Sequence, residues 1–241
     1  MLSQARRELL ESLNIPMSKA DVTQLKKQQQ RRISAWEQNM KMLLFIKRVL
    51  DVALSGMALL MASPLFIIVG LFIYIENPGP IFYTQIRVGL NGRTFPFYKF
   101  RSMVMNADQM KDALLDQNES GGGVIFKMKN DPRITRIGRF IRRFSIDEMP
   151  QFLNVFIGDL SIVGPRPPVP REVAEYTLED RKRLHVKPGL TCFWQIQGRS
   201  EIPFDEQVRL DLQYIRSSGP LSDLMIMFKT VPAVLFGKGA Y

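Results

Sequence analysis

Cysteine and histidine are almost absent from this chain of 241 residues, which contains one of each, Cys192 and His185. A single cysteine cannot form a disulfide within the chain, and this pair alone argues against a His/Cys zinc site. A Ser-His-Asp triad would have to rest on His185. Reactive chemistry, if the chain performs any, therefore falls to carboxylates, arginines, lysines and hydroxyl groups.

Charge is absent from residues 52–75, a run of 24 positions that reads "VALSGMALLMASPLFIIVGLFIYI". A straight helix of this length reaches ~36 Å at ~1.5 Å per residue, enough for the core of a bilayer. The alternative is a buried helix in a soluble domain, but such a helix rarely stays uncharged for so long. We therefore expect this segment to enter a membrane.

Ser63 and Pro64 lie at the middle of the uncharged run. Proline removes one helical hydrogen bond and clashes with the preceding turn, so a kink is expected, and the serine hydroxyl can satisfy the freed carbonyl. Both flanks are basic, which leaves the positive-inside rule no gradient to act on. The simplest geometry is a re-entrant helix that enters, bends at Ser63-Pro64 and returns. The basic flanking residues are Lys41, Lys47 and Arg48 before the run and Arg87, Arg93, Lys99 and Arg101 after it.

Acidic residues are outnumbered, 23 against 33 basic ones, and the net charge is +10. The first 50 residues contribute +6 of this excess, from ten Lys/Arg and four Asp/Glu. Such an excess attracts phosphate polymers or an anionic membrane face equally well. We expect residues 1–40 to form a basic, polar N-terminal arm without a secretory signal, and residues 41–241 to form one membrane-associated domain that includes the hydrophobic helix 48–76.

The remaining chain alternates turn signals with helical patterns, which favours a mainly helical α+β fold. The turn signal "GLNG" separates two aromatic and β-branched runs, so a small β-hairpin is expected near 81–101. We further expect a helix at 104–117, a mobile glycine-rich loop at 119–124, helical structure over 134–160 with a break near 145, a rigid loop at 164–172, an amphipathic helix "FDEQVRLDLQYI" and a membrane-surface helix "LSDLMIMFKTVPAVLF".

The stretch "SIDEMPQ" at 145–151 has several interpretations. Ser145 with Glu148 fits a capping box, and Asp147 would lie in the first helical turn, where the dipole favours an acid. The cap does not account for the nearby arginines, which recur every three residues and form a basic stripe typical of an anion site. Asp147 is then either an ion-pair partner or a carboxylate nucleophile that faces a bound phosphate. The stripe consists of Arg133, Arg136, Arg139 and Arg142.

Two further cations occur in loops. Prolines on both sides of Arg166 in "GPRPP" restrict the backbone, so the guanidinium is presented with little entropy left to lose. This suits bidentate phosphate binding, although a structural turn with a surface arginine fits equally well. Arg199 lies beside a glycine in "QIQGRS". The residues alone therefore favour an enzyme that handles phosphates at a membrane surface.

With these motifs in view, the chain resembles the bacterial sugar transferases, the monotopic polyprenyl-phosphate phosphoglycosyl transferases. The resemblance covers residues from about 45 to 200, and the tail "GKGAY" fits as well. The matching pieces are "KRVLDVALSG" leading into "ASPLF", "NPGPIFYTQIRVGLNGRTFPFYKFRSM", "KMKNDPRITRIGRFIRRFSIDEMPQFLNVFIGDLSIVGPRP" and "KPGLTCFWQIQGR".

The resemblance implies transfer of a sugar phosphate from a UDP-sugar to undecaprenyl phosphate, giving a diphosphate-linked lipid and UMP. Asp147 would be the nucleophile and Glu148 a catalytic residue and ligand of Mg²⁺. Amphipathic interfacial helices would surround an active site on the cytoplasmic face of the bacterial inner membrane, with no nucleic acid involved and room for a homo-oligomer. Substrate would contact Arg142, Arg166, Arg199, Lys99 and Arg101, Ser63-Pro64 would break the membrane helix, and Lys47-Arg48 would meet lipid headgroups.

The chain departs from the family pattern at Cys192-Phe193-Trp194, where many relatives have Gly-Trp-Ala. Where longer members have several N-terminal spanning helices, we expect the basic arm of about 40 residues instead. The alternative function is a non-catalytic, membrane-anchored basic protein that binds anionic lipid or nucleic acid. That alternative predicts dispensable acids and binding that falls steeply with salt. The transferred sugar and the polysaccharide pathway stay open.

Overall fold

The structure is a computed structural model that describes residues 19–111, 128, 130–198 and 202–235. The chain consists of two units, residues 1–47 and residues 48–241. Helices dominate the described residues and strands are few and short, so the prediction of a mainly helical α+β fold is confirmed. The glycine-rich loop predicted at 119–124 lies outside the described residues.

The N-terminal half of helix α2 (Lys19–Glu76) belongs to the first unit. Its side chains from Val22 onward are almost all exposed, as the polar and basic composition of this stretch predicts. The helix of the second unit begins with Arg48 and contains the uncharged run. By length and composition this part of α2 is apolar enough to cross a membrane, and most of it is not buried against the rest of the protein.

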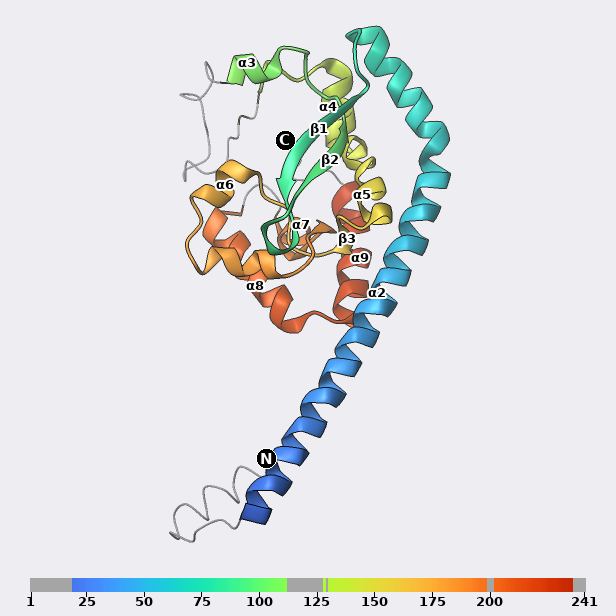
Figure 1. The fold of residues 1–241 in the computed structure, drawn as a ribbon. Coiled ribbons are helices and arrows are strands. Elements are labelled where there is room, and N and C mark those ends of the chain that lie inside the picture. Colours follow the sequence, from blue (N-terminus) through green and yellow to red (C-terminus); the bar gives the residue numbers. More distant parts are fainter. Residues whose placement is uncertain (1–18, 112–127, 129, 199–201, 236–241) are drawn as a thin grey trace. The chain divides into compact units, whose positions relative to one another are not determined.

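The apolar part of α2 continues through Ser63 and Pro64 without interruption. The sequence predicts a kink there, which an uninterrupted helix allows, and the break of the membrane helix implied by the resemblance stays a prediction. Pro64 cannot donate to the carbonyl of Leu60, but the hydroxyl of Ser63 donates to that carbonyl instead, over 2.8 Å. This substitution satisfies the freed acceptor, so the helix bends rather than ends, and its axis changes direction within the apolar part (Figure 1).

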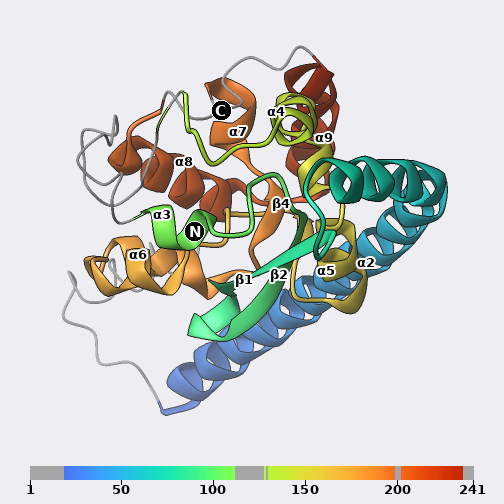
Figure 2. The same cartoon turned by 90° about the horizontal axis from the view of Figure 1, so that it is seen from above.

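Strands β1 (Phe82–Val88) and β2 (Thr94–Phe100) form the predicted antiparallel hairpin, with Phe82 opposite Phe100 and Val88 opposite Thr94. A short 3₁₀ turn, η1 (Leu90–Gly92), connects them. Asn91 at φ 54° and Gly92 at φ 80° occupy the left-handed region, which the "GLNG" turn signal anticipates. The hairpin lies between α6 (Pro170–Ala174), beside β1, and α5 (Gln151–Ile157), beside β2 (Figure 2).

The region predicted to be helical with a break near 145 contains α4 (Arg136–Arg143), the 3₁₀ turn η3 (Ile146–Glu148) and α5. The prediction of this break is confirmed. The N-terminus of α4 is fixed by Thr135, whose hydroxyl accepts from Gly138 N over 2.9 Å. The carboxylate of Glu76, at the end of α2, accepts from the next free amides, Arg136 N over 2.7 Å and Ile137 N over 2.9 Å. The end of α2 therefore sets where α4 begins.

The C-terminal part contains a pair of short parallel strands, β3 (Ser161–Val163) and β4 (Gly189–Thr191), which the sequence analysis did not predict. The rigid loop predicted at 164–172 is shorter than expected, because α6 begins at Pro170. Proline fits the first helical position, where its missing amide has no partner to lose. The other elements are α3 (Ala107–Lys111), η4 (Asp180–His185), α7 (Phe193–Gln197), α8 (Phe204–Ser217) and α9 (Pro220–Leu235).

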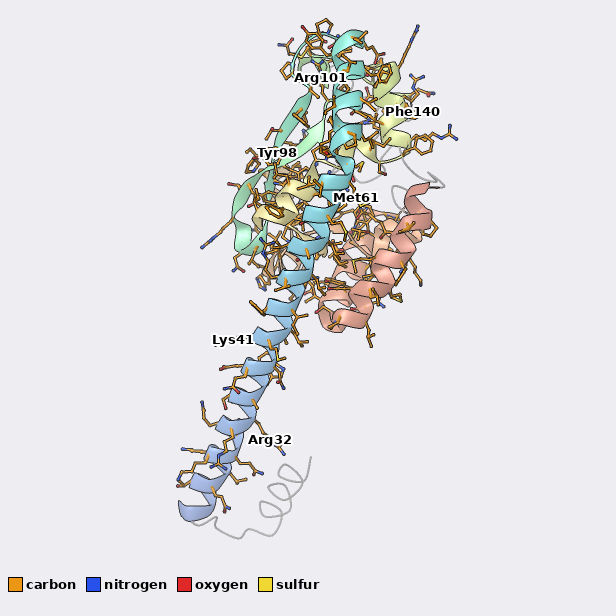
Figure 3. All side chains as sticks on the ribbon, turned by 90° about the vertical axis from the view of Figure 1, so that its right-hand side faces the viewer. Arg32, Lys41, Met61, Tyr98, Arg101 and Phe140 are labelled. Atoms are coloured by element: carbon orange, nitrogen blue, oxygen red, sulfur yellow. The ribbon has the colours of Figure 1, made fainter. Side chains whose placement is uncertain are left out.

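The interior of the second unit is built from small apolar clusters around the hairpin and the parallel strands. One cluster joins Phe97 of β2 to Val155 of α5 and Leu160, and another joins Trp194 of α7 to Ile226 of α9. Large apolar side chains stay exposed on the helices, as with Met61 on α2 (74% exposed) and Phe140 on α4 (57% exposed), both labelled in Figure 3. Exposed apolar surface of this kind is typical of a membrane-facing region.

Candidate active site

The Asp147-Glu148 dyad lies in the 3₁₀ turn η3, between two helices. Ser145, just before it, adopts the left-handed conformation at φ 55° and its side chain makes no capping hydrogen bond. The capping-box interpretation of Ser145 and Glu148 is therefore wrong. The left-handed Ser145 follows the end of α4 and changes the direction of the chain. The turn that carries Asp147 and Glu148 therefore packs against β2 of the hairpin.

Asn154 of α5 holds this turn against the hairpin. Its side-chain amide donates to the carbonyl of Pro96 over 2.7 Å, and its side-chain oxygen accepts from Tyr98 N over 3.1 Å. Both partners are on β2, and Asn154 itself is fully buried. Since α5 follows the dyad directly, these two bonds bring the dyad next to the end of β2, where Lys99 lies.

Glu148 is the meeting point of two predicted site residues. Its Oε1 accepts from Lys99 Nζ over 3.1 Å and from Arg166 Nη2 over 2.9 Å. Burial alone would raise the pKa of Glu148, but the charges of Arg166 and Lys99 and their hydrogen bonds outweigh burial and hold the pKa well below its usual range. Glu148 is therefore ionised at any physiological pH, and it in turn raises the pKa of Arg166.

Asp147 behaves differently although it is the neighbouring residue. Only 6% of it is exposed, and burial raises the pKa of its carboxyl to about 6, helped by the negative charge of Glu148 and opposed by Lys99 and Arg142. The carboxylate still predominates at neutral pH. The two acids thus have distinct states: Glu148 is ion-paired with Lys99 and Arg166, whereas Asp147 is buried and none of the described residues forms an ion pair with it.

The predicted arginine stripe is only partly correct. Arg133 precedes α4 and is buried in a two-pronged ion pair with Asp131, whose oxygens lie 2.9 and 2.6 Å from its nitrogens. Arg136 and Arg139 are exposed. Arg142 is the member that turns toward the site, where its Nε donates to Ser102 Oγ over 3.1 Å and its charge lowers the pKa of Asp147.

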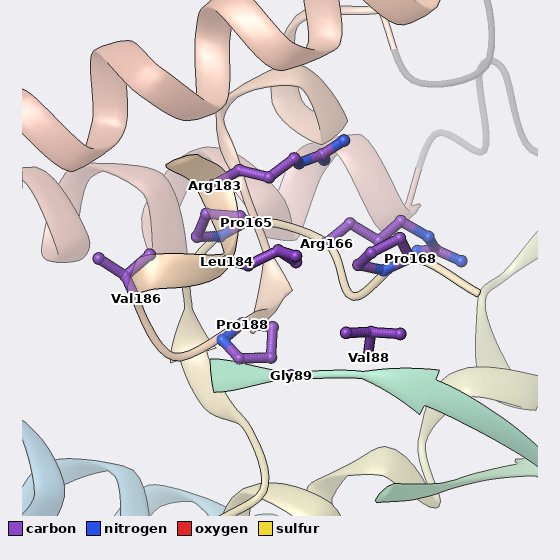
Figure 4. A pocket seen from close by; sticks show the side chains of 9 residues that line it. All are labelled: Val88, Gly89, Pro165, Arg166, Pro168, Arg183, Leu184, Val186 and Pro188. Carbon is purple, nitrogen blue, oxygen red and sulfur yellow. The ribbon is translucent and has the colours of Figure 1, made fainter. Parts of the chain in front are cut away.

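The loop that carries Arg166 is rigid, as the prolines predict. Gly164 N donates to Thr191 O over 3.0 Å, and Gly189 N donates to Pro165 O over 2.8 Å, which ties the loop to β4. Figure 4 shows Pro165 and Pro168 on either side of Arg166, with Val88 of β1 beneath them. A Cβ added at Gly189 would lie 2.1 Å from Gly164 N, so only glycine allows this close approach.

The other predicted site residues make different contacts or lie outside the described residues. Arg101 is buried near the C-terminal end of α2, where it donates to the carbonyl of Asn77 and to the sulfur of Met105 (Figure 3). Arg199 lies outside the described residues. Arg48 donates to the last carbonyls of α5, Val155 O over 2.7 Å and Phe156 O over 2.8 Å, and thus caps that helix. A headgroup contact of Lys47 and Arg48 stays a prediction.

Sequence reasoning missed Arg87, which lies in β1 beside the site. Its guanidinium donates to Gln85 Oε1 over 3.1 and 2.8 Å and to Pro167 O over 3.0 Å. Its position two residues from Gln85 on one strand was the available signal, because such residues share a face of the sheet. Its attachment to the proline loop depends on tertiary packing and could not be read from spacing.

A metal ion would find hard oxygen ligands at the dyad. Among the residues that the structure describes, no group of three or more His, Cys, Asp or Glu side chains gathers. Mg²⁺ is often held by one or two carboxylates together with substrate phosphates, rather than by a cage of protein ligands. Glu148 fits that pattern, which needs the substrate to complete the shell.

Comparison with known proteins assigns the chain to a family. The family model of the bacterial sugar transferases matches residues 42–237. The chain belongs to this family. The sugar transferase is 47% identical to the galactosyl transferase CpsE of Streptococcus agalactiae, over 82% of its own length and 44% of that protein. It is 44% identical to the undecaprenyl-phosphate galactose phosphotransferase of Salmonella typhimurium, over 82% of its own length and 42% of the relative.

A shorter relative matches almost throughout. The exopolysaccharide production protein ExoY of Sinorhizobium fredii is 39% identical over 81% of the sugar transferase and 88% of ExoY. The chain thus spans less than half the length of the first two relatives but corresponds to most of ExoY. The matched region contains every element that builds the site, from the apolar half of α2 to α9.

Proposed function

We propose that this sugar transferase moves a sugar 1-phosphate from a UDP-sugar to undecaprenyl phosphate and releases UMP, as the first step of exopolysaccharide, capsule or O-antigen assembly. The observation that carries the proposal is the buried Asp147, adjacent to Glu148 with its two bound cations, Lys99 and Arg166. The names of the relatives support the same lipid carrier, because several are undecaprenyl-phosphate sugar phosphotransferases.

In the first half-reaction a carboxylate oxygen of Asp147 attacks the β-phosphorus of the UDP-sugar. A bond forms between this oxygen and phosphorus, and the bond between the β-phosphorus and the bridging oxygen breaks. The electron pair leaves with UMP. Because Asp147 is buried, its carboxylate is poorly solvated, and a poorly solvated anion is a stronger nucleophile once cations neutralise the approaching diphosphate.

In the second half-reaction an oxygen of undecaprenyl phosphate attacks the same phosphorus. The bond between Asp147 and phosphorus breaks, the carboxylate is regenerated, and the lipid carries the sugar through a diphosphate. The covalent intermediate lets the soluble UMP leave before the lipid acceptor arrives, so this route predicts ping-pong kinetics. Direct attack of the lipid phosphate on the donor would instead require both substrates at once.

The surrounding residues offset the repulsion between a carboxylate and a diphosphate. Arg142 and Arg166 would bind phosphate oxygens, while Lys99 is bonded to Glu148 and its charge lowers the pKa of Asp147. Glu148 would hold Mg²⁺, which when bound supplies positive charge for the diphosphate and the departing UMP. Binding of Mg²⁺ would then require the Glu148 carboxylate, whose Oε1 accepts from Lys99 and Arg166, to be shared between these cations and the ion.

Exposed apolar surface supports a membrane location for the reaction. We propose that the bent α2 enters and leaves the bacterial inner membrane on the cytoplasmic side, with α9 along the surface. Leu221 (82% exposed) and Phe228 (70% exposed) of α9 are suited to this, as are Met61 and Leu60 (76% exposed) of α2. A water-soluble donor and a membrane-bound acceptor would then meet at the dyad.

The direct test is UMP release by membranes that contain the protein, with undecaprenyl phosphate, Mg²⁺ and a panel of UDP-sugars. Galactose is the first sugar to try, since two of the relatives are named for galactose, but glucose and N-acetylgalactosamine belong on the panel. Release with one donor, lost in Asp147→Asn and kept in Asp205→Asn, supports the proposal. Asp205 is an exposed aspartate of α8 and serves as the matched control. Full release in Asp147→Asn would overturn the covalent route.

The alternative of a non-catalytic basic binding protein is separated by the same experiment. It predicts no UMP release with any donor, and lipid or nucleic-acid binding that falls steeply as salt rises. The burial of Asp147 speaks against it, because an anion-binding surface gains nothing from a buried carboxylate.

A further inference from the structure

We propose that Arg87 is a positioning residue, which holds the loop around Arg166 so that the Arg166 guanidinium is aimed at the phosphate-binding side of Glu148. The inference rests on the proposed function, because it concerns the site at which the nucleoside diphosphate would bind. Arg87 lies on the hairpin, and its side chain donates to Gln85 and to Pro167 O rather than to Asp147 or Glu148.

The contacts of Arg87 leave its guanidinium a single orientation. Nε and Nη2 both donate to Gln85 Oε1, over 3.1 and 2.8 Å, and Nη1 donates to Pro167 O over 3.0 Å. The guanidinium carbon lies 5.3 Å from the centre of the Phe97 ring, which is itself almost fully buried. Gln85 and Phe97 are opposite each other across the hairpin, so the Arg87 side chain contacts both members of one cross-strand pair.

The bond to Pro167 is one of a series that fixes the loop residue by residue. Gly189 N holds the carbonyl of Pro165, Arg87 holds that of Pro167, and Val88 N holds that of Pro168 over 2.9 Å. Arg166 is the residue between the first two anchors. With the backbone held on both sides, its side chain reaches Glu148 Oε1 over 2.9 Å. If the Arg87 anchor is lost, the loop stays held by β4 at Pro165 and by Val88 at Pro168, but the residue directly after Arg166 is no longer fixed.

The charges support a role for Arg87 beyond stability. Burial and the nearby charge of Arg166 lower the pKa of Arg87 to about 10, while the charges of Glu172 and Glu148 oppose this, and Phe97 also lies 5.4 Å from Lys99 Nζ. Three cations, Arg87, Lys99 and Arg166, therefore lie near two acids, Glu148 and Glu172, of which Glu148 is ion-paired to Lys99 and Arg166. Partly buried like charges cost folding free energy, so a bound polyanion accounts for the excess of cations.

Lysine would not replace arginine in this role. The fork of the guanidinium reaches the side-chain oxygen of Gln85 and the carbonyl of Pro167 at the same time, whereas an ammonium group is a compact point charge on a flexible chain. Arg87→Lys therefore keeps the charge and loses the geometry. That separates an electrostatic role from a positioning role.

The test is a double-mutant cycle of Arg87→Met and Arg166→Met, read by the dissociation constant of UDP and by kcat/KM of UMP release. If Arg87 acts through Arg166, Arg87→Met weakens both quantities by about tenfold or more in the wild type and by less than about threefold in the Arg166→Met background. Arg87→Lys should resemble Arg87→Met. Gln85→Leu, which keeps Arg87 but removes its acceptor, should show a smaller loss in the same direction.

The contrary results are equally definite. Equal losses in both backgrounds would mean that Arg87 touches the ligand itself or supports the fold independently, and full rescue by Arg87→Lys would mean that only its charge matters; each overturns the proposal. Arg93→Met, on the same hairpin but exposed, should change neither quantity. If Arg87→Met does not fold, Arg87→Lys and Gln85→Leu provide the same cycle.

The UDP-binding arm separates this inference from the proposed function. Coupled losses in UDP affinity without UMP release from any donor would leave the positioning role standing and contradict the transfer reaction. UMP release together with uncoupled losses would support the transfer reaction and overturn the positioning role of Arg87. A wild-type protein that binds no UDP and releases no UMP overturns both.

Discussion

Asp147 is a carboxylate held where burial opposes its charge. The pKa of its carboxyl, about 6 in the folded protein, lies above its ordinary value of 3.8, so the folded state binds the proton more tightly than the unfolded state does. Stability from this group is therefore fully present below pH 3.8 and is lost as pH rises through 6. At neutral pH, where the carboxylate is needed for attack, the site is destabilised by it.

Asp147→Asn should therefore stabilise the protein while it abolishes UMP release. The neutral amide removes a buried charge, and the gain should be on the order of 1 to 3 kcal/mol at pH 7.5. Thermal unfolding in detergent measures it, with Asp205→Asn as the exposed control, which should instead lose up to about 1 kcal/mol because Asp205 lies in the first turn of α8. A lower melting temperature in Asp147→Asn would mean that the carboxylate is paired more strongly than the structure indicates.

The pH dependence of the first half-reaction should follow the same group. UMP release in a single turnover without lipid acceptor should fall as pH drops through about 6, because protonated Asp147 cannot attack. Leaving out the acceptor matters, since its phosphate titrates near pH 6 as well. Glu148 should not contribute in this range, because Arg166 and Lys99 keep its pKa far lower. A rate that is constant from pH 7.5 to 5 would contradict this assignment.

At the level of residues, the sequence identified the dyad but not its supporting contacts. Asp147 and Glu148 stand out because two acids follow many arginines, and Lys99 and Arg166 do meet Glu148. The spacing of three residues between the arginines wrongly placed Arg133 in the helical stripe. Arg133 lies before α4 and pairs with Asp131, two residues away. Arg101 bonds to Asn77 O and the sulfur of Met105, and its contact with substrate stays a prediction. A buried cation that satisfies a carbonyl and one that binds substrate look alike in sequence.

At the level of elements, the end of α2 and the start of α4 form one unit. Glu76→Ala should leave the amides of Arg136 and Ile137 without their carboxylate acceptor and lower the free energy of unfolding by about 1 to 2 kcal/mol. Glu76→Gln should recover part of this loss, because an amide oxygen still accepts. Glu175→Ala, at an exposed position, is the control in the same denaturant titration. Equal stability of the Glu76 and Glu175 variants would show that α4 does not need this cap.

Elements with local signals were predictable and those without were not. The hairpin has a turn sequence and aromatic strands, and the helical pattern over 134–160 is interrupted near 145, so both were found. The parallel strands β3 and β4 are three residues each and depend on partners 28 residues apart in the chain, as with Ser161 and Gly189. Ser63-Pro64 also had a local signal, because the proline predicts a kink and the serine hydroxyl was expected to satisfy the freed carbonyl, as it does at Leu60 O.

At the level of the whole molecule, the topology of α2 decides where the site lies. The native Cys192 is buried and its burial raises the pKa of the thiol above its usual range, so it should react poorly with maleimides. Single cysteines introduced as Ser34→Cys before the apolar run and Arg93→Cys after it, both at exposed positions, can therefore report their sides of the membrane. A re-entrant helix predicts that a membrane-impermeant maleimide labels both in inverted vesicles. Labelling of only one would mean that α2 spans the membrane.

The central claim, attack by Asp147, is tested most directly by intact-mass measurement of the purified protein after incubation with the active UDP-sugar and Mg²⁺ in the absence of lipid acceptor. The account predicts that a fraction of the wild-type protein gains the mass of one sugar phosphate, that peptide mapping places it on Asp147, that undecaprenyl phosphate removes it, and that Asp147→Asn gains nothing. Active wild-type protein that gains no mass before the acceptor is added would contradict the account and favour direct transfer.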